Sequence, residues 1–318
     1  MLLFLIFIGL LYFRAYAQDV PNIRLSNGLI KAKVLLPDSE HGFYKGARFD
    51  WAGVISQLEY KGHSFFGKWF IWPQDSTKQN TIMGPVEAFD PLGYQETKTG
   101  GHFVKIGIGV LENTDDAKYY FGYPYKIVDT GEWTIKHNEN RVEFNHRLTN
   151  GPYPYSYTKT IEFLEGVATM RISHTLKNSG SQIIDTQVFN HNYFVIDENN
   201  VDAGYQIQFP FKIIANNEGL RDFAEIENNQ INFKSGLAEN EHVYIGSIKG
   251  FSSDPQDYNL TLESINAGVG VNIMGDRPLS RVVFWAATKT ACPEPYIDVK
   301  VAPGESFSWT LTYNFYTL

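Results

Sequence analysis

The chain has 318 residues, of which 43% are hydrophobic, 15% aromatic and 19% charged, and its formal charge is −8. This composition excludes a disordered chain, which would be poor in aromatic residues. A single cysteine, Cys292, excludes a disulfide scaffold. The acidic balance also argues against a nucleic-acid-binding surface, which would be basic.

Residues 1–17 have the pattern of an export signal. Met1 to Tyr12 is almost wholly apolar, and Ala15-Tyr16-Ala17 has the small-x-small pattern that a signal peptidase cleaves. The alternative is a membrane anchor, but the apolar run is shorter than the roughly 20 residues that span a bilayer. We expect a signal peptide at 1–17, a mature chain at 18–318 without a membrane span, and a secreted or periplasmic location.

Strands are expected along the whole mature chain, because apolar and polar residues alternate and Val, Ile, Thr, Tyr and Phe dominate. Turns are expected at 61–63, 165–166 and 178–181. The expected strands cover residues 29–34, 53–60, 103–111, 132–136, 141–148, 155–163, 168–176, 182–190, 205–211, 243–248, 282–286 and 306–315. No long 3.6-residue period is present, so helices should be short and few. We predict an all-β fold, a single large antiparallel β-sandwich domain over 18–318.

Motifs of several large enzyme classes are absent from the sequence. It has no Gly-rich phosphate loop, no His-Glu-x-x-His zinc helix, no Cys-x-x-Cys pair, no EF-hand calcium loop and no Gly-x-Ser-x-Gly elbow. Kinase, dehydrogenase, zinc-hydrolase and serine-hydrolase functions therefore lose most of their support. Any chemistry would depend on His, Glu, Asp, Lys, Arg and Tyr side chains, and we expect neither a metal nor a cofactor.

Two short stretches combine chemistry-bearing side chains with a rigid setting. Phe189 to Ile196 places His191 among aromatic residues at the end of an expected strand. Cys292 to Pro295 holds Glu294 between two prolines, which restrict the backbone and fix where the side chain points. We expect Glu294 on a stiffened loop at strand ends. Each residue also has a structural explanation, with His191 packed beside Tyr193 or Glu294 capping a turn in solvent.

At these two stretches the sequence resembles the aldose 1-epimerases, also called galactose mutarotases. His191 to Phe194 is similar to the family's His-x-Tyr-Phe signature. Glu294-Pro295, with Pro303-Gly304-Glu305 and the Tyr-x-Phe strand at 313–315, is similar to its C-terminal end. The resemblance implies a galactose mutarotase-like β-supersandwich, in which the matching Glu is the base and the matching His is the acid.

The corresponding chemistry needs one acid and one base. Interconverting the α and β forms of a free sugar requires removal of the anomeric hydroxyl proton while the ring oxygen is protonated. The ring opens to an aldehyde, which rotates and closes on its other face. An ionised Glu294 is a competent base, and His191 is a competent proton donor near neutral pH. We expect both in one cavity, with functional atoms on the order of 5–8 Å apart, because each must bind a different oxygen of one ring.

Further residues are candidates for binding the sugar. Arg48 and Asp50 lie with Trp51 in a short stretch before a strand, where an arginine fork could bind vicinal hydroxyls. The alternative is a surface Arg–Asp pair with Trp51 in the core. Glu87 and Lys105 lie near glycines that let the backbone approach a ligand. The alternative for both is a solvated sheet face.

Aromatic and imidazole side chains complete the candidate binding set. Tyr193 belongs to the signature itself. The family carries a second His in an early segment that this sequence lacks, and His102 is the candidate for that place. Trp69 and Trp72 could line a glycan cleft, although a place in the core is the more frequent use of tryptophan.

The leading interpretation is an exported aldose 1-epimerase-like isomerase that acts on a mono- or oligosaccharide and has no nucleic-acid partner. Two alternatives stay open. One is a non-catalytic glycan-binding protein on the same fold. The other is a polysaccharide lyase, in which Tyr or His would abstract a proton beside a uronate and Arg48 and Lys105 would neutralise its carboxylate.

Overall fold

The computed structural model describes residues 20–70, 75–115 and 117–318. The export signal expected at 1–17 and Trp72 lie outside these residues. Strands make up nearly all regular structure in the described ranges, and helical structure there is limited to two 3-10 turns, η1 (Glu218–Leu220) and η2 (Pro255–Asp257). None of the helical segments in these ranges is long and apolar enough to cross a membrane.

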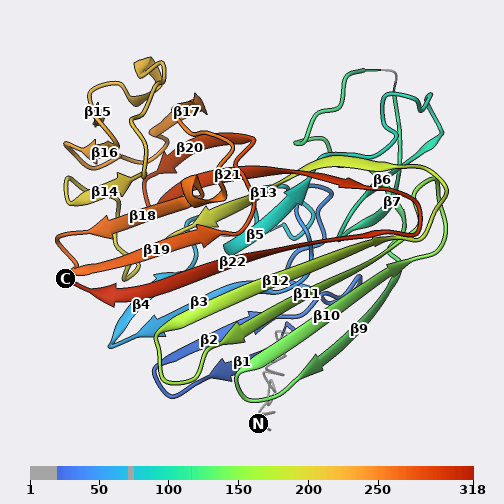
Figure 1. Ribbon diagram of the computed structural model, residues 1–318, viewed down its shortest axis with the longest axis horizontal. Helices are drawn as coiled ribbons and strands as arrows, with labels where there is room; N and C mark the ends of the chain where they lie inside the picture. The colour runs from blue at the N-terminus through green and yellow to red at the C-terminus, as the bar shows by residue number, and fades with distance from the viewer. Residues whose placement is uncertain (1–19, 71–74, 116) are drawn as a thin grey trace, which may run out of the picture.

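The largest sheet has ten antiparallel strands, several of them long (Figure 1). In spatial order they are β15 (Ala224–Glu227), β16 (Gln230–Phe233), β14 (Tyr205–Gln208), β18 (Asn259–Ser264), β19 (Val269–Gly275), β22 (Ser306–Thr317), β12 (Thr169–Asn178), β11 (Tyr155–Phe163), β10 (Arg141–Leu148) and β9 (Glu132–His137).

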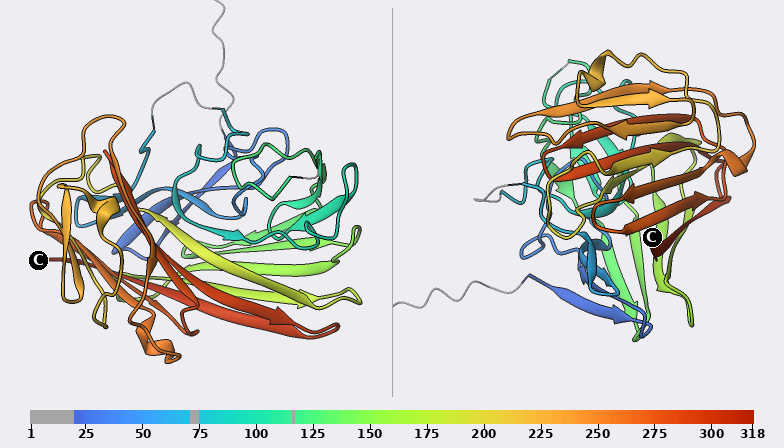
Figure 2. Two further views of the ribbon diagram at one scale, coloured as in Figure 1. Left: turned by 90° about the horizontal axis from the view of Figure 1, so that it is seen from above. Right: turned by 90° about the vertical axis from the view of Figure 1, so that its left-hand side faces the viewer.

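Three smaller sheets complete the architecture, and the described residues between 20 and 125 lie largely on one side of the long strands (Figure 2, left). The five-stranded sheet has the order β17 (His242–Ile248), β20 (Arg281–Ala287), β21 (Thr290–Val301), β13 (Ile184–Tyr193) and β5 (Gly84–Phe89). The four-stranded sheet runs β1 (Asn22–Ser26), β2 (Ile30–Leu35), β3 (Val54–Tyr60), β4 (His63–Phe66). The three-stranded sheet runs β6 (His102–Lys105), β7 (Gly109–Glu112), β8 (Ile127–Asp129).

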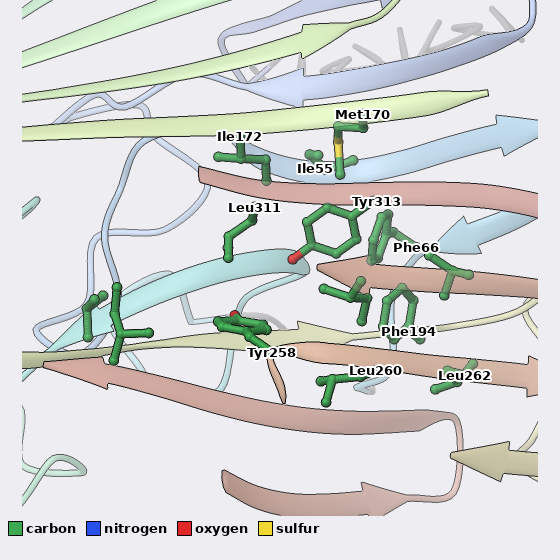
Figure 3. Packing of buried hydrophobic residues seen from close by; sticks show 14 of the residues in the cluster. Ile55, Phe66, Met170, Ile172, Phe194, Tyr258, Leu260, Leu262, Leu311 and Tyr313 are labelled. Atoms are coloured by element: carbon green, nitrogen blue, oxygen red, sulfur yellow. The ribbon is translucent and has the colours of Figure 1, made fainter. Parts of the chain in front are cut away.

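The core lies between the ten-stranded sheet and the smaller sheets (Figure 3). Ile172 of β12 and Leu311 of β22 are cross-strand partners, and both are buried. Phe66 of β4 stacks on Phe194, just after β13, with ring centroids 5.1 Å apart. Full burial of one such side chain stabilises the fold by about 1.5–3 kcal/mol. The alternation of apolar residues seen in the sequence thus becomes the inner face of a β-sandwich, and the predicted fold class is confirmed.

The boundaries of the strands differ from the sequence prediction in two instructive places. Residues 103–111, predicted as one strand, form β6 and β7 with a tight turn between them. Gly107 and Gly109 adopt φ of +78° and +137°, which side-chain-bearing residues rarely adopt. The loop predicted around Glu294 is also wrong, because this residue lies inside the long strand β21.

Candidate active site

The candidate site is a cavity of about 600 Å³ on one face of the five-stranded sheet. Side chains in a strand alternate between the two faces, so every second residue can reach the cavity. The lining includes Gln187, Phe189, His191 and Tyr193 from β13, Glu294 and Tyr296 from β21, Arg281, Val283 and Trp285 from β20, and Arg48, Trp69, Lys105 and Tyr119 from elsewhere. A cavity of this volume is typical of small-molecule sites.

His191 and Glu294 lie opposite one another where β13 and β21 separate. The two strands stop pairing after Phe189 and Tyr296, whose rings stack with centroids 4.5 Å apart. Two residues further along, on the same face, come His191 and Glu294. Their Nε2 and Oε1 atoms are 3.3 Å apart, and both side chains are almost fully buried. The two stretches singled out in the sequence therefore meet at one cavity.

The separation of about 5–8 Å expected between these groups is wrong. Side chains that face each other on neighbouring antiparallel strands start from Cβ atoms only about 4.5–5.5 Å apart. His191 and Glu294 occupy such opposed positions, so the ends of their side chains meet directly. The residue types were recognisable from the sequence, but this register of β13 on β21 was not.

The prolines beside Glu294 explain why the two strands part. Pro293 and Pro295 pair with β20 on one side and have no N–H to offer β13 on the other. The side chain of Asn192 fills the gap, with its Nδ2 donating to the Pro293 carbonyl at 2.9 Å. The Tyr313 hydroxyl in turn lies 2.8 Å from Asn192 Oδ1. An amide and a phenol thus replace the missing strand ladder behind the site.

Burial shifts the proton affinity of both central groups. It raises the pKa of Glu294 to about 7, although the positive charges of Arg48 and Arg281 oppose this shift. Burial also lowers the pKa of His191 well below its usual value, and Arg48 adds to that effect. His191 Nδ1 is buried without a hydrogen-bond partner in the described residues. A neutral imidazole with its hydrogen on Nε2, facing Glu294, is therefore the favoured form.

Three cationic side chains surround the pair. The Arg48 guanidinium lies between two rings, 4.3 Å from the centroid of Phe121 and 4.5 Å from that of Phe49. Lys105 is buried, which lowers the pKa of its ammonium to about 7, and its Nζ lies 3.2 Å from the Tyr119 hydroxyl. Arg281 is anchored by a carbonyl on β17. In the described ranges, no cluster of three or more His, Cys, Asp or Glu could hold a metal ion.

An aromatic stack supports the imidazole. The ring of Tyr193 lies parallel to that of His191, with centroids 3.8 Å apart, and Trp69 stacks on the other face of Tyr193 at 5.3 Å. Trp69 also donates from Nε1 to the Ile82 carbonyl. The predicted candidates Arg48, Lys105 and Tyr193 are thus brought to the cavity, and Trp69 lines it as well.

Three other predicted binding residues lie away from this cavity. Asp50 and Glu87 are buried in the interior, where Lys159 contacts Glu87 and lies 3.6 Å from Asp50. Glu87 also lies 3.2 Å from His174. His102, at the start of β6, is exposed and does not line the cavity.

The surroundings of Asp50 and Glu87 explain their place inside the protein. Burial alone would raise the pKa of Glu87, but the interactions with Lys159 and His174 are stronger and lower that pKa. For Asp50, burial prevails over Lys159 and raises the pKa to about 7. Trp51 is buried and donates to the Gly46 carbonyl, which agrees with the core alternative for that residue.

Sequence reasoning missed several lining residues that a simple rule could have found. Gln187 and Phe189 precede His191 by four and two residues, and Tyr296 follows Glu294 by two, so period-two extension places them on the same face. Arg281 pairs with Tyr296 in the neighbouring strand, and only the register of β20 on β21 reveals that contact.

Comparisons with known proteins support the fold. No family model matches the chain, and no match is found among curated protein sequences. Solved structures do match. A galactose mutarotase-like protein from Clostridium acetobutylicum has a TM-score of 0.56 at 14% identity, covering 93% of this chain and 95% of that one. A galactose mutarotase-like protein from Lactobacillus casei gives 0.54 at 12%, covering 93% and 100%.

A third similar structure is the aldose epimerase homologue from C. elegans, with a TM-score of 0.52 at 14% identity, covering 94% of this chain and 100% of that one. At these identities the likeness concerns the fold. The chain therefore has the antiparallel β-sandwich fold of the aldose 1-epimerase and galactose mutarotase-like proteins.

Proposed function

We propose that this protein is an aldose 1-epimerase-like enzyme that interconverts the anomers of a sugar by acid–base ring opening. The observation that carries the proposal is the buried contact between His191 and Glu294 in a cavity of about 600 Å³. Burial that perturbs the pKa values of an acid and a base in one cavity is typical of catalytic sites. The likeness of the fold to galactose mutarotase-like proteins supports the same choice.

Glu294 is assigned as the base. A general base works best when its pKa lies near the working pH, and burial raises the pKa of Glu294 to about 7. In its ionised form the carboxylate accepts the proton of the anomeric hydroxyl. Arg48 and Arg281 oppose the rise in pKa, so they keep an ionised fraction available at neutral pH.

His191 is assigned as the acid. Its low pKa favours a neutral ring, whose Nε2–H protonates the ring oxygen as the C1–O bond breaks, while Nε2 regains a proton from Glu294, which has taken the proton of the anomeric hydroxyl. The anomeric hydroxyl and the ring oxygen are both bonded to C1. Two side chains in direct contact can therefore serve both oxygens, which agrees with the 3.3 Å between His191 Nε2 and Glu294 Oε1.

Optical rotation of freshly dissolved α-glucose and α-galactose tests the proposal. The protein should accelerate the approach to equilibrium, and Glu294→Gln or His191→Ala should each slow turnover by about 10²–10⁴-fold. Asp197→Asn is the matched control, because His63 and Asp197 form a similar pair, 2.8 Å apart, that does not line the cavity. Full activity of Glu294→Gln would contradict the assignment, and no acceleration of any sugar would contradict the function.

A polysaccharide lyase remains the second candidate, because Arg48, Lys105 and Arg281 all line the cavity. These cations could neutralise the carboxylate of a uronate while a nearby base removes the adjacent proton. Incubation with uronate polymers distinguishes the two reactions. New ultraviolet absorbance from an unsaturated product would favour the lyase, whereas binding of glycans without either reaction would favour a non-catalytic protein.

We also propose export after cleavage behind Ala17. The apolar run from Met1 and the Ala15-Tyr16-Ala17 pattern support this proposal. Expression of the full chain in an exporting host, followed by mass measurement, should give a protein that begins at Gln18. A protein that retains residues 1–17 would contradict cleavage.

A further inference from the structure

A second hollow, of about 930 Å³, lies beside the candidate site. The two hollows share Asp90, Tyr119 and Gln187 in their linings. The Asp90 N–H donates to the Gln187 carbonyl at 2.9 Å, which continues the pairing of β5 with β13 by one residue. The two spaces therefore adjoin at Asp90, Tyr119 and Gln187, so a ligand that extends past these residues from the cavity reaches the second hollow.

The second hollow contains an aromatic platform. Tyr153 is half-buried, and its ring lies directly against the backbone of Gly93, where an added Cβ would come within 2.9 Å of the ring. Gly93 has a φ of +77°, a conformation that suits glycine. The contact is with the edge of the ring at Cε2, so Gly93 holds the ring without covering either face, and a ring face is the surface on which the C–H side of a pyranose stacks.

The polar lining of the second hollow fits hydroxyl groups. Asp90, Glu96 and Asp185 contribute three carboxylates to the lining and Lys118 contributes one ammonium, while Lys300 lies 3.0 Å from Asp185. Ionised carboxylates only accept hydrogen bonds, so they match the hydroxyl donors of a neutral sugar and repel a uronate or a phosphate. The cationic lining of the main cavity therefore does not continue into this space.

We propose that the second hollow binds the uncharged sugar residue attached to the one in the cavity, so that the preferred ligand is a di- or oligosaccharide with its reducing end at His191 and Glu294. This inference rests on the proposed function. Beyond that function, it states that the protein discriminates between a free monosaccharide and a longer glycan.

The test compares monosaccharides with a panel of neutral disaccharides that have α and β linkages at different positions. Calorimetry measures affinity, and anomer exchange measures kcat/KM. At least one disaccharide should exceed its reducing-end monosaccharide in affinity and in kcat/KM. Tyr153→Ala should lower the affinity for that disaccharide by about 3- to 10-fold without changing the values for the monosaccharide.

Two variants sharpen the test. Tyr153→Phe retains the ring and should retain the preference for the disaccharide. Tyr60→Ala removes a half-buried tyrosine that lines neither hollow, and it should leave both ligands unaffected. The inference is overturned if no disaccharide binds more tightly than its monosaccharide, or if Tyr153→Ala leaves the preference intact. If sugars bind with this preference but no anomer exchange occurs, the second hollow stands and the proposed reaction fails.

Discussion

Replacement of Glu294 by glutamine should make the protein less active and more stable at alkaline pH. The native pKa of Glu294 is raised from 4.5 to about 7, chiefly by burial. Below the pKa that Glu294 has in the unfolded chain, its carboxyl is neutral in both the native and the unfolded state, so it does not lower the free energy of unfolding. As the pH rises to about 7, the unfolded chain ionises more readily than the native one, so stability falls. Above about pH 7 the free energy of unfolding is lowered by the full amount that corresponds to the pKa shift.

The size of the effect follows from the pKa shift. One pKa unit corresponds to about 1.4 kcal/mol, so the raised pKa of Glu294 implies a cost of roughly 3 kcal/mol at pH 8. Glutamine has nearly the same shape and no charge. Glu294→Gln should therefore have a free energy of unfolding up to about 3 kcal/mol larger than the wild type at pH 8, and nearly the same as the wild type at pH 4.5.

Urea denaturation of both proteins at a series of pH values measures this difference. It should grow as the pH rises through the range from 4.5 to 7, which isolates Glu294 because other titrating groups are common to both proteins. Asp197→Asn, at the partly exposed pair outside the cavity, should not reproduce the gain. If Glu294→Gln is no more stable than the wild type at pH 8, the argument that burial is the main cause of the raised pKa of Glu294 is refuted.

Three further predictions concern pH and the interior behind the site. The kcat/KM for anomer exchange should rise with pH through about 7 as Glu294 ionises, and a profile that is flat from pH 5 to 8 would exclude it as the base. Lys159→Met leaves the buried Glu87 without its closest cation, so it should lower the free energy of unfolding, measured by urea denaturation, by roughly 3–5 kcal/mol. Lys300→Met, at an exposed pair, should lower it by at most about 1 kcal/mol. Asn192→Leu removes the hydrogen-bond donor to the Pro293 carbonyl, so the free energy of unfolding should fall by about 1–3 kcal/mol. The kcat should also fall, because the substitution disturbs the contact of Glu294 with β13. An unchanged kcat would contradict this positioning role of Asn192.

The sequence was sufficient for the fold class because the sandwich rests on local alternation. Segments such as 141–148 and 155–163 alternate in the sequence, and they form β10 and β11 with the same limits. Two of the strands absent from the sequence prediction lack this pattern. In β5 (Gly84–Phe89) every residue is buried, so no alternation marks it. In β21 two prolines hide a strand that is paired on one side only at that point.

The candidate site was only partly predictable for a related reason. His191 and Glu294 carry residue types and neighbours that stand out in the sequence. The roles of Glu87 and Lys105 could not be separated, because both are polar residues near glycines. Their difference depends on register: Glu87 is the cross-strand partner of Asn190 and shares its interior face, whereas Lys105 reaches the cavity from β6. No single segment contains that information.

Residues on the two faces of β13 have different roles, one face serving the cavity and the other the stability of the interior. His191 points into the cavity, whereas its neighbours Asn190 and Asn192 point to the interior, where Asn190 donates to Glu87 and Asn192 lies beside Tyr313. Removing a cavity-facing group relieves a desolvated charge or leaves space that a ligand would fill. Removing an interior group leaves a buried partner unsatisfied, which costs more. Substitutions along this one strand should therefore alternate, as the pleat does, between mainly losing turnover and mainly losing stability, and Asn192 should affect both because it also holds the Pro293 carbonyl beside Glu294.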